Sequence, residues 1–355
     1  MRRMLITGGA GFIGSRLHRL AASSGWDVRI LDSLRADVHG SAPSGRRSDT
    51  DFIHGDVTDP DVLDAALEGV DVVSHQAAKV GLGVNMADAP DYARTNVAGT
   101  AEVLAAMRRH GVQRLVLASS MVIYGEGAYR VPGSGVVARP APRLAADLIA
   151  GNFDPYDADT KELLVPELLS EDAPTDPRNV YATTKLAQEH LASSWARETG
   201  GRAAILRYHN VYGPGMPRDT PYAGVASLFR SALERGEAPR VYEDGAQRRD
   251  FVHVSDVAGA NMASADWTDS APEGAVRAFN VGSGRVSTIG EMATALSDAF
   301  GGPAPLTTGE FRLGDVRHIT ASSERASKEL GWHAAVPFEE GMREFATAPL
   351  RSAGS

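Results

Sequence analysis

Short apolar runs alternate with amphipathic stretches along the first 120 residues. Five apolar runs read as buried strands, at 4–7, 28–31, 51–57, 71–78 and 113–120. Between them, apolar residues recur at helical spacing at 12–24, 59–69 and 86–109. Because strands that alternate with helices form parallel sheets, we expect this half of the chain to be a doubly wound α/β (Rossmann) fold.

The second half mixes the same elements in a less regular order. Residues 178–197 have apolar positions at helical spacing and no glycine or proline, which predicts a long helix. A strand is expected from 202 to about 213, helices at 222–236 and 288–300, and short strands at 241–245 and 251–254. The loop that Pro214, Pro217 and Pro221 bracket should carry substrate contacts.

These elements divide the chain into two regions and an insert. Residues 1–200 are expected to form the Rossmann domain, and residues 201–345 mainly a smaller substrate-binding α/β region. Strand 202–213 is expected to return to the Rossmann sheet. Prolines are frequent at about 128–175, which predicts an irregular flap or an outlying element inserted in the first domain.

Composition then narrows the classes of function. The 355 residues are 43% hydrophobic, which supports a packed core. The net charge of -9, with scattered basic residues, argues against a nucleic-acid-binding surface. The absence of cysteine excludes disulfides, a thiol nucleophile and thiolate metal sites. Glycines interrupt the basic N-terminal start, and no apolar run approaches membrane-spanning length, so we expect a cytoplasmic protein.

A glycine-rich turn follows the first expected strand and opens the first expected helix. Its glycines, Gly8, Gly11 and Gly14, are evenly spaced. In such turns the first glycine permits a tight turn, the second lets the backbone approach a pyrophosphate, and the third lets the helix pack on the strand. Free N–H groups at the helix N-terminus then favour an anion. The turn therefore predicts a dinucleotide site.

Asp32 ends the second expected strand, about 20 residues past the glycines, where an acid binds ribose hydroxyls in dinucleotide sites. A carboxylate there repels a 2′-phosphate, so we expect NAD rather than NADP. The alternative is an aspartate that only forms the turn after the strand. The stretch Gln76–Lys79 and Ser120 also lie at carboxyl ends of expected strands, where ligands bind. Small residues in that stretch let a cofactor lie close to the backbone.

Tyr181 and Lys185 are four residues apart on the expected helix 178–197, so they share one of its faces. An ammonium close to a phenol favours the phenolate and lowers the pKa of the tyrosine toward the working pH. The pair would then act as a general base for a hydroxyl proton. The alternative is a surface tyrosine and a solvated lysine, and the N-terminal glycines favour the catalytic interpretation.

The histidines give no sign of a metal site. His75, His209, His253 and His318 are not at metal-ligand spacing, so we interpret them as hydrogen-bonding or core residues.

Seven motifs together resemble the extended short-chain dehydrogenase/reductases. They are TGGAGFIG (7–14), LDSL (31–34), HGDVTD (54–59), SSMVIYG (119–125), YATTK (181–185), RYHNVYGP (207–214) and RRDFVHVSDVA (248–258). Within that family the chain is similar to NAD-dependent nucleotide-sugar 4-epimerases. The stretches YGEGAYRVP, DPRNVYATTKLAQEHL and MPRDTPYAG look most like those of dTDP-L-rhamnose 4-epimerases.

The resemblance implies a role for each matched position. Ser120 and Tyr181 flank the sugar hydroxyl that is oxidised, and Lys185 holds the nicotinamide ribose and lowers the pKa of Tyr181. The implied NAD-binding residues are Gly8, Gly11, Phe12, Ile13, Gly14, Asp32, Ser33, Asp56, Val57, Gln76, Ala77, Ala78, Lys79, Asn96, Ser119, Tyr181, Lys185 and Tyr208. The implied residues for a nucleotide-diphosphate sugar are Val80, Gly81, Ser120, Met121, Val122, Tyr181, Asn210, Arg249 and Arg312.

The residues after Ser120 reduce the number of reaction types that this family resemblance allows. Relatives that eliminate water carry an Asp-Glu pair at the positions of Met121 and Val122, and decarboxylating relatives carry a Glu at the position of Val122. Relatives that epimerise beside a ketone use a cysteine, which this chain lacks. Hydride chemistry remains, with a 4-keto sugar that rotates before it is reduced again. Val80, Gly81, Leu82 and Met121 suit a wall that holds the sugar loosely.

Two other classes of function stay open. One is an oxidoreductase that releases a keto sugar, and the other is a non-catalytic NAD-binding regulatory protein. The substrate is expected to be a dTDP-6-deoxyhexose, a UDP-hexose or a UDP-uronic acid. The helices 86–109 and 178–197 resemble those that form a homodimer in the family. Apolar residues of the first helix, Val97, Val103, Leu104 and Met107, make a stripe wider than one core face needs.

Overall fold

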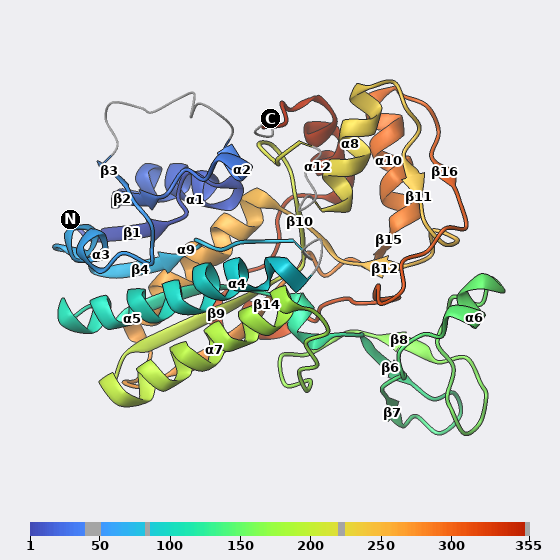
Figure 1. The fold of residues 1–355 in the computed structure, drawn as a ribbon, viewed down its shortest axis with the longest axis horizontal. Helices are drawn as coiled ribbons and strands as arrows, with labels where there is room; N and C mark the ends of the chain where they lie inside the picture. Colours follow the sequence, from blue (N-terminus) through green and yellow to red (C-terminus); the bar gives the residue numbers. More distant parts are fainter. Residues whose placement is uncertain (40–50, 82–85, 219–223, 352–355) are drawn as a thin grey trace.

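The computed structural model describes residues 1–39, 51–81, 86–218 and 224–351. Seven parallel strands form its central sheet, in the order β14-β9-β5-β4-β1-β2-β3 (Figure 1). They are β1 Arg3–Thr7, β2 Asp27–Asp32, β3 Asp51–His54, β4 Val72–His75, β5 Arg114–Ser120, β9 Arg202–Tyr208 and β14 Val276–Val281. The expected doubly wound sheet is confirmed. Strand order reverses between β1 and β4, so ligands are expected at the carboxyl ends of these strands.

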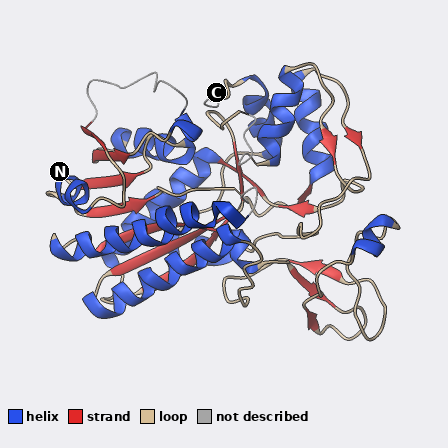
Figure 2. Ribbon diagram, in the orientation of Figure 1, coloured by secondary structure: helices blue, strands red, loops and turns tan. Residues whose placement is uncertain are grey.

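Helices cover both faces of the sheet (Figure 2). One face packs against α1 (Phe12–Ser23), α9 (Val254–Ser270) and α11 (Glu324–Leu330), and the other against α3 (Pro60–Leu67), α5 (Gly99–Arg109) and α7 (Val180–Thr199). Successive strand residues point to opposite faces. Met4 and Ile6 therefore join the apolar cluster under α1 and α9, whereas Leu5 joins the cluster under α3 and α5. Both faces are buried, which explains the continuous apolar runs of these strands.

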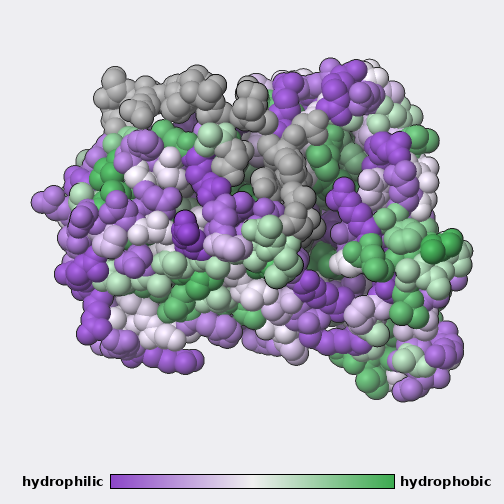
Figure 3. Space-filling model, in the orientation of Figure 1, coloured by the Kyte–Doolittle hydropathy of each residue, from purple (hydrophilic) through white to green (hydrophobic). Residues whose placement is uncertain are grey.

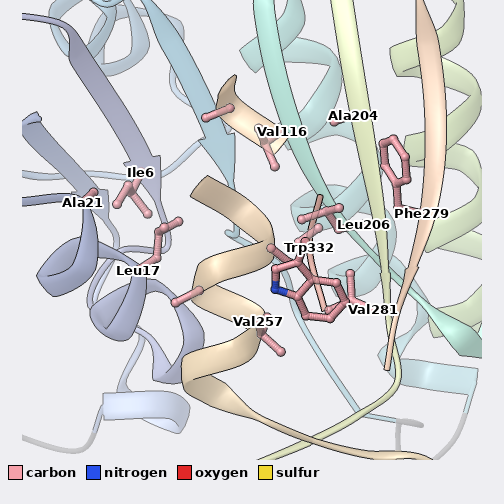
Figure 4. Close-up of a cluster of buried hydrophobic side chains, with 14 of the residues drawn as sticks. Ile6, Leu17, Ala21, Val116, Ala204, Leu206, Val257, Phe279, Val281 and Trp332 are labelled. Carbon is pink, nitrogen blue, oxygen red and sulfur yellow. The ribbon is translucent and has the colours of Figure 1, made fainter. Parts of the chain in front are cut away.

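The apolar cluster under α9 contains residues from the N-terminal, middle and C-terminal parts of the chain. Figure 4 shows Ile6 and Leu17 from the N-terminal elements on one side of α9, and Leu206, Val281 and Trp332 on the other. The Trp332 indole also donates a hydrogen bond to the Asp256 carbonyl oxygen of α9, at 3.1 Å. The C-terminal third is therefore part of this core.

The helix expected at 86–109 is made of four pieces. It runs as a 3₁₀ turn at Met86–Asp88, α4 at Ala89–Tyr92, a π-helical stretch at Ala93–Ala98, and α5. Single π turns inside helices often lie at functional sites. This one carries Asn96, whose side chain is fully buried and binds the backbone of Lys79.

The strand expected from 202 to 213 is two strands. β9 stays in the central sheet, but β10 (Asn210–Tyr212) pairs with β13 (Phe251–His253) in a separate two-stranded sheet. The chain changes partner at His209: its amide donates to Val281 of β14, and the next amide, of Asn210, donates to Asp250. Asn210 is thereby carried out of the sheet toward the second region.

The remaining C-terminal elements form a smaller α/β unit at the upper right of Figure 1. Helices α8 (Val225–Glu234), α10 (Ile289–Phe300) and α12 (Phe338–Thr347) share an apolar core. Around them, β11 (Arg240–Val241) pairs with β16 (Leu306–Thr307), and β12 (Arg248–Arg249) with β15 (Ser287–Thr288). Part of the expected substrate loop, including Pro221, lies outside the described residues, as does Leu82.

The insert is an outlying lobe rather than an irregular flap. Antiparallel strands β6 (Ala128–Arg130), β7 (Val137–Ala138) and β8 (Val165–Glu167) form a small sheet, with α6 (Ala145–Ile149) beside it. Figure 3 shows hydrophobic surface over this lobe, to which Leu144 and Ile149 contribute with exposed side chains. No helix of the described residues is long and apolar enough to cross a membrane.

Candidate active site

A cleft of about 1240 Å³ lies between the carboxyl edge of the central sheet and the C-terminal unit. Nearly all of the expected binding residues line it. From residues 1–200 these are Gly8, Gly11, Phe12, Ile13, Gly14, Asp32, Ser33, Asp56, Val57, Gln76, Ala77, Ala78, Val80, Gly81, Ser119, Ser120, Met121, Val122, Tyr181 and Lys185. From residues 201–345 they are Tyr208, Asn210, Arg249 and Arg312. The fold thus gathers residues that are far apart in the sequence.

The glycine turn forms a cradle that side chains would fill. Gly8 has a φ of 67°, and a Cβ on it would lie 2.7 Å from the amide nitrogen of Ala77. A Cβ on Gly14 would lie 2.3 Å from the carbonyl oxygen of Gly8. Gly11 is the N-cap of α1 and offers no side-chain cap to the first N–H groups of that helix. Open N–H groups at a helix N-terminus suit a pyrophosphate, so the turn fits a dinucleotide.

Asp32 is fixed as a carboxylate beside this turn. Its two oxygens accept hydrogen bonds from the amides of Ala10, at 3.0 Å, and Leu34, at 2.9 Å. Burial favours the neutral acid, but hydrogen bonds from His39 of α2 (Ala36–His39) and from those amides outweigh it and lower the pKa of Asp32. The negative charge is therefore kept at the place where an adenosine ribose is expected.

Lys79 and Asn96 are the two expected cofactor residues that do not line the cleft. The Asn96 side chain accepts from the Lys79 amide at 2.8 Å, and donates to the Lys79 carbonyl and to Thr184. The Lys79 ammonium lies 2.5 Å from Asp91 and over the ring of Tyr92. In the structure, the side chains of Lys79 and Asn96 therefore stabilise the 76–81 segment without lining the cleft.

Ser120, Tyr181 and Lys185 meet at the carboxyl end of β5. Helix α7 brings Tyr181 and Lys185 there from one face, and its N-terminus is capped by the Asn179 side chain, which accepts from the Ala182 amide at 2.8 Å. The Lys185 ammonium donates to the Ala118 carbonyl at 2.9 Å. The Tyr181 ring packs against Tyr92, with ring centroids 6.2 Å apart. The phenol is thereby held beside Ser120.

The pKa values of this pair differ from the expectation that lysine lowers the tyrosine pKa. Burial raises the pKa of Tyr181 to about 12, and only a hydrogen bond with Ser120 opposes it. Burial also lowers the pKa of Lys185 to about 7, partly opposed by the charge of Glu189. Loss of water thus disfavours the charged form of each of the two side chains.

The far end of the cleft carries polar groups without partners. The Asn210 side-chain oxygen and both ring nitrogens of His209 are buried and have no hydrogen bond. Burial lowers the pKa of His209 to about 3, so its ring is neutral. The Arg249 guanidinium donates only to backbone carbonyls, and no carboxylate of the described residues forms an ion pair with it. A cation and unpaired polar atoms suit an anionic, hydroxyl-rich ligand.

Several lining residues have no local signal in the sequence. Arg351, near the end of the chain, donates to the Ala10 carbonyl and to His39 beside the glycine turn. Tyr242 lies under the Arg312 guanidinium, 5.2 Å from ring centroid to carbon. Only tertiary packing brings Arg351 and Tyr242 to the cleft. Asn179 also lines the cleft, and it could have been found in the sequence as an N-cap residue before the apolar helix. No group of histidines and acids in the described part of the chain could hold a metal ion.

A dinucleotide cradle beside a Ser-Tyr-Lys group defines a nicotinamide-dependent enzyme of the α/β class. Residues 4–143 and 155–282 match the NAD dependent epimerase/dehydratase family. The chain is 36% identical over 354 residues to dTDP-L-rhamnose 4-epimerase of Burkholderia thailandensis, in a match that covers 98% of this chain and 94% of that protein.

Solved structures agree. The UDP-glucose 4-epimerase of Thermus thermophilus, in complex with NAD, has a TM-score of 0.74 and 30% identity. MoeE5 in complex with UDP-glucuronic acid and NAD has a TM-score of 0.74 and 31% identity. Each covers 97% of this chain, and the chain covers 97% of each. The chain belongs to the NAD-dependent epimerase/dehydratase family.

Proposed function

We propose that this protein is an NAD-dependent 4-epimerase of a nucleoside-diphosphate sugar that works through a transient 4-keto intermediate. The observation that carries the proposal is the meeting of Ser120, Tyr181 and Lys185 at the cleft beside Met121 and Val122. The first three suit removal of a hydroxyl proton, whereas the last two cannot transfer a proton. The site therefore fits hydride chemistry without elimination or decarboxylation.

Tyr181 takes the proton from the C4 hydroxyl, and Ser120 orients that hydroxyl from the end of β5. The glycine turn of Gly8, Gly11 and Gly14 would hold NAD, which would supply reversible hydride chemistry at C4, so that no external reductant would be needed. Because burial raises the pKa of Tyr181, the phenolate needs positive charge close by when it acts as a base. Lys185 supplies such a charge from one helical turn away.

The rest of the cleft holds the nucleotide more firmly than the sugar. Arg249 and Arg312 face the diphosphate, since guanidinium groups match phosphate oxygens. Near Tyr181 the wall is made of Val80, Gly81 and Met121, which offer few polar side-chain contacts. A 4-keto sugar can then rotate between the two hydride transfers.

A panel of nucleotide sugars tests the proposal. Purified protein would be incubated separately with dTDP-L-rhamnose, UDP-glucose and UDP-glucuronic acid, and the products analysed by NMR at C4. We expect one of them to reach an equilibrium between C4 epimers with no net change in nicotinamide absorbance. Net formation of NADH with release of a keto sugar would instead assign the oxidoreductase function. Binding without any turnover would leave the regulatory function.

We also propose that the protein is a cytoplasmic homodimer. The π-helical stretch with α5 lies beside α7 on one side of the molecule (Figure 1). The small side chains of Ala98, Ala101 and Ala105 are exposed there. The expectation that this helix has a wide apolar stripe free for a dimer contact is wrong, because Val103, Leu104 and Met107 are buried in the core of their own chain. The small exposed residues, rather than that stripe, support the proposed contact between the two subunits.

A further inference from the structure

The insert reaches the substrate wall through a buried arginine. The Arg143 guanidinium, just before α6, donates to the Glu243 carboxylate at 2.8 Å and to the Asp315 carbonyl at 2.6 Å. Both side chains of the ion pair are almost fully buried, at 9% and 3% exposure. Glu243 and Asp315 line the cleft on two different loops of the C-terminal unit. One side chain of the insert thus ties two loops of the wall together.

A second arginine completes this ionic cluster from the wall side. The Arg317 side chain has no exposed surface and lies 2.9 Å from Glu243, 2.7 Å from Asp244 and 2.7 Å from Asp154 of the insert. A buried guanidinium is stable only when carboxylates or carbonyls surround it. Asp154 supplies one of these acids, so the insert takes part in compensating the Arg317 charge.

Glu243 is held in an unusual backbone conformation at the centre of the cluster. Its φ is 54°, in the left-handed region that non-glycine residues rarely adopt. Such a conformation persists only where the surroundings determine it. Here its amide donates to the Glu310 carbonyl at 2.7 Å, while its carboxylate accepts from Arg143 and Arg317. Loss of Arg143 would remove one of these restraints.

The same cluster orients the arginine that faces the ligand. Arg249 donates to the carbonyls of Arg317, at 3.0 Å, and Val316, at 2.6 Å. His318 accepts from the Arg248 amide through Nδ1, so its Nε2 carries the proton and donates to Asp154 at 3.2 Å. Asp154 therefore binds two consecutive side chains of the segment whose carbonyls hold Arg249.

We propose that the insert is a working part of the substrate site, in which Arg143 and Asp154 are positioning residues. They hold the wall formed by 240–249 and 312–318 in the shape that binds the nucleoside diphosphate through Arg249. The inference rests on the proposed function of this wall. It gives the insert a role in substrate affinity, whereas a lobe that only adds stability would leave affinity unchanged.

Variants of the holoenzyme separate these roles. We expect Arg143→Met to raise the KM for the active nucleotide sugar, and the Kd of dTDP or UDP measured by calorimetry, on the order of tenfold. That is the scale of one lost hydrogen bond to a charged group. Asp154→Asn keeps the shape and removes the charge, so we expect a smaller rise in the same direction. The kcat should stay within about twofold and NAD content should not change, because the group at Tyr181 is untouched.

The matched control is Arg130→Met. Arg130 also pairs with a glutamate of the insert, Glu167, but both lie within the insert sheet and are partly exposed. Its KM and Kd should equal those of the wild type. Thermal unfolding of all variants identifies any that fold poorly, and Asp154→Asn, whose side chain is 46% exposed, is the mildest change.

Unchanged KM and Kd in both Arg143→Met and Asp154→Asn would overturn the inference, as would an equal rise in Arg130→Met. The proposed function can fail separately. If the wild type epimerises no sugar of the panel but binds dTDP or UDP, weaker binding by the two variants still supports the inference. If the wild type binds neither nucleotide, both proposals are overturned.

Discussion

At the scale of single residues, burial acts on both members of the Tyr181–Lys185 pair. It raises the phenol pKa and lowers the ammonium pKa, so each side chain tends toward its neutral form in the protein alone. The phenolate form of Tyr181, which accepts the proton of the sugar hydroxyl, must therefore be stabilised by positive charge in the assembled site.

Tyr181→Phe tests which group is the base. The change removes the proton acceptor and keeps the ring against Tyr92, so turnover should fall by at least about 10²-fold with folding and NAD content unchanged. Ser120→Ala should cost less, since Ser120 only orients the hydroxyl. Tyr156→Phe, in the insert, is the matched control and should turn over normally. Turnover near the wild-type rate in Tyr181→Phe would place the base elsewhere.

Lys185→Met tests the electrostatic role of the ammonium. Turnover requires the phenolate, so it should rise with pH through the Tyr181 pKa. In the complex with NAD and substrate, a Lys185 ammonium beside the phenolate would lower that pKa, so its removal should move the acidic limb of the pH–rate profile to higher pH. NAD retention should also weaken, because the ammonium is expected to hold the ribose. An unmoved acidic limb would contradict this role.

Unfolding gives an independent check on the Lys185 pKa. The pKa is lowered from 10.5 to about 7 in the folded chain, so between these values the unfolded chain binds the extra proton. The free energy of unfolding contributed by this group therefore rises as pH increases from about 7 to 10. Lys185→Met should lose that rise in urea melts recorded across this range, relative to the wild type.

Asp32→Asn tests the choice of cofactor. Removing the carboxylate that is fixed beside the glycine turn should weaken NAD binding and reduce discrimination against NADP. Arg351, which lies close by, would then face a 2′-phosphate without an opposing charge. The measurement is the ratio of Kd values for the two cofactors. Asp27→Asn, at the other end of the same strand, should leave the ratio unchanged, and tighter binding of NADP by the wild type would refute the assignment.

At the scale of elements, close approach between the first strand, the glycine turn and α1 sets what the cofactor site tolerates. Gly14→Ala would place a Cβ 2.3 Å from the Gly8 carbonyl oxygen, so we expect loss of NAD and a lower melting temperature. Gly259→Ala in α9 is the control, because its Cβ would meet Trp332 at an ordinary 3.5 Å. It should raise helix stability slightly. Equal NAD content in both variants would show that the turn is not crowded.

The same elements show how far the sequence can be read. Periodicity finds the strands of the central sheet because both of its faces are buried, so their apolar runs are continuous. It misses the π-helical stretch, since the side chain of Asn96 binds backbone far away in the sequence. Periodicity also misses the change of strand partner at His209 and the pairing of β14 with β9, because the partners of these segments depend on tertiary packing. Residues such as Arg351 reach the cleft for the same reason.

At the scale of the whole molecule, the outward face of α5 and α7 is the surface that we propose as the contact between the two subunits of the homodimer. Ala105→Arg places a long charged side chain on that face, so we expect the dimer to become a monomer by light scattering at micromolar concentration. Ala65→Arg, on the exposed face of α3, is the control and should remain a dimer. A monomeric wild type would refute the proposal.

The completion of the central sheet by β14 has a consequence for how the chain is made. β9 is an inner strand only once Val276–Val281 has paired along it, and α9 must already cover one face. During synthesis, residues 1–200 therefore leave the ribosome with an open sheet, and the part of its apolar face that α9 and α11 later cover is bare. They should aggregate when expressed as a fragment. The chain is expected to rely on chaperones until about residue 281 has emerged, and then to close its first domain late.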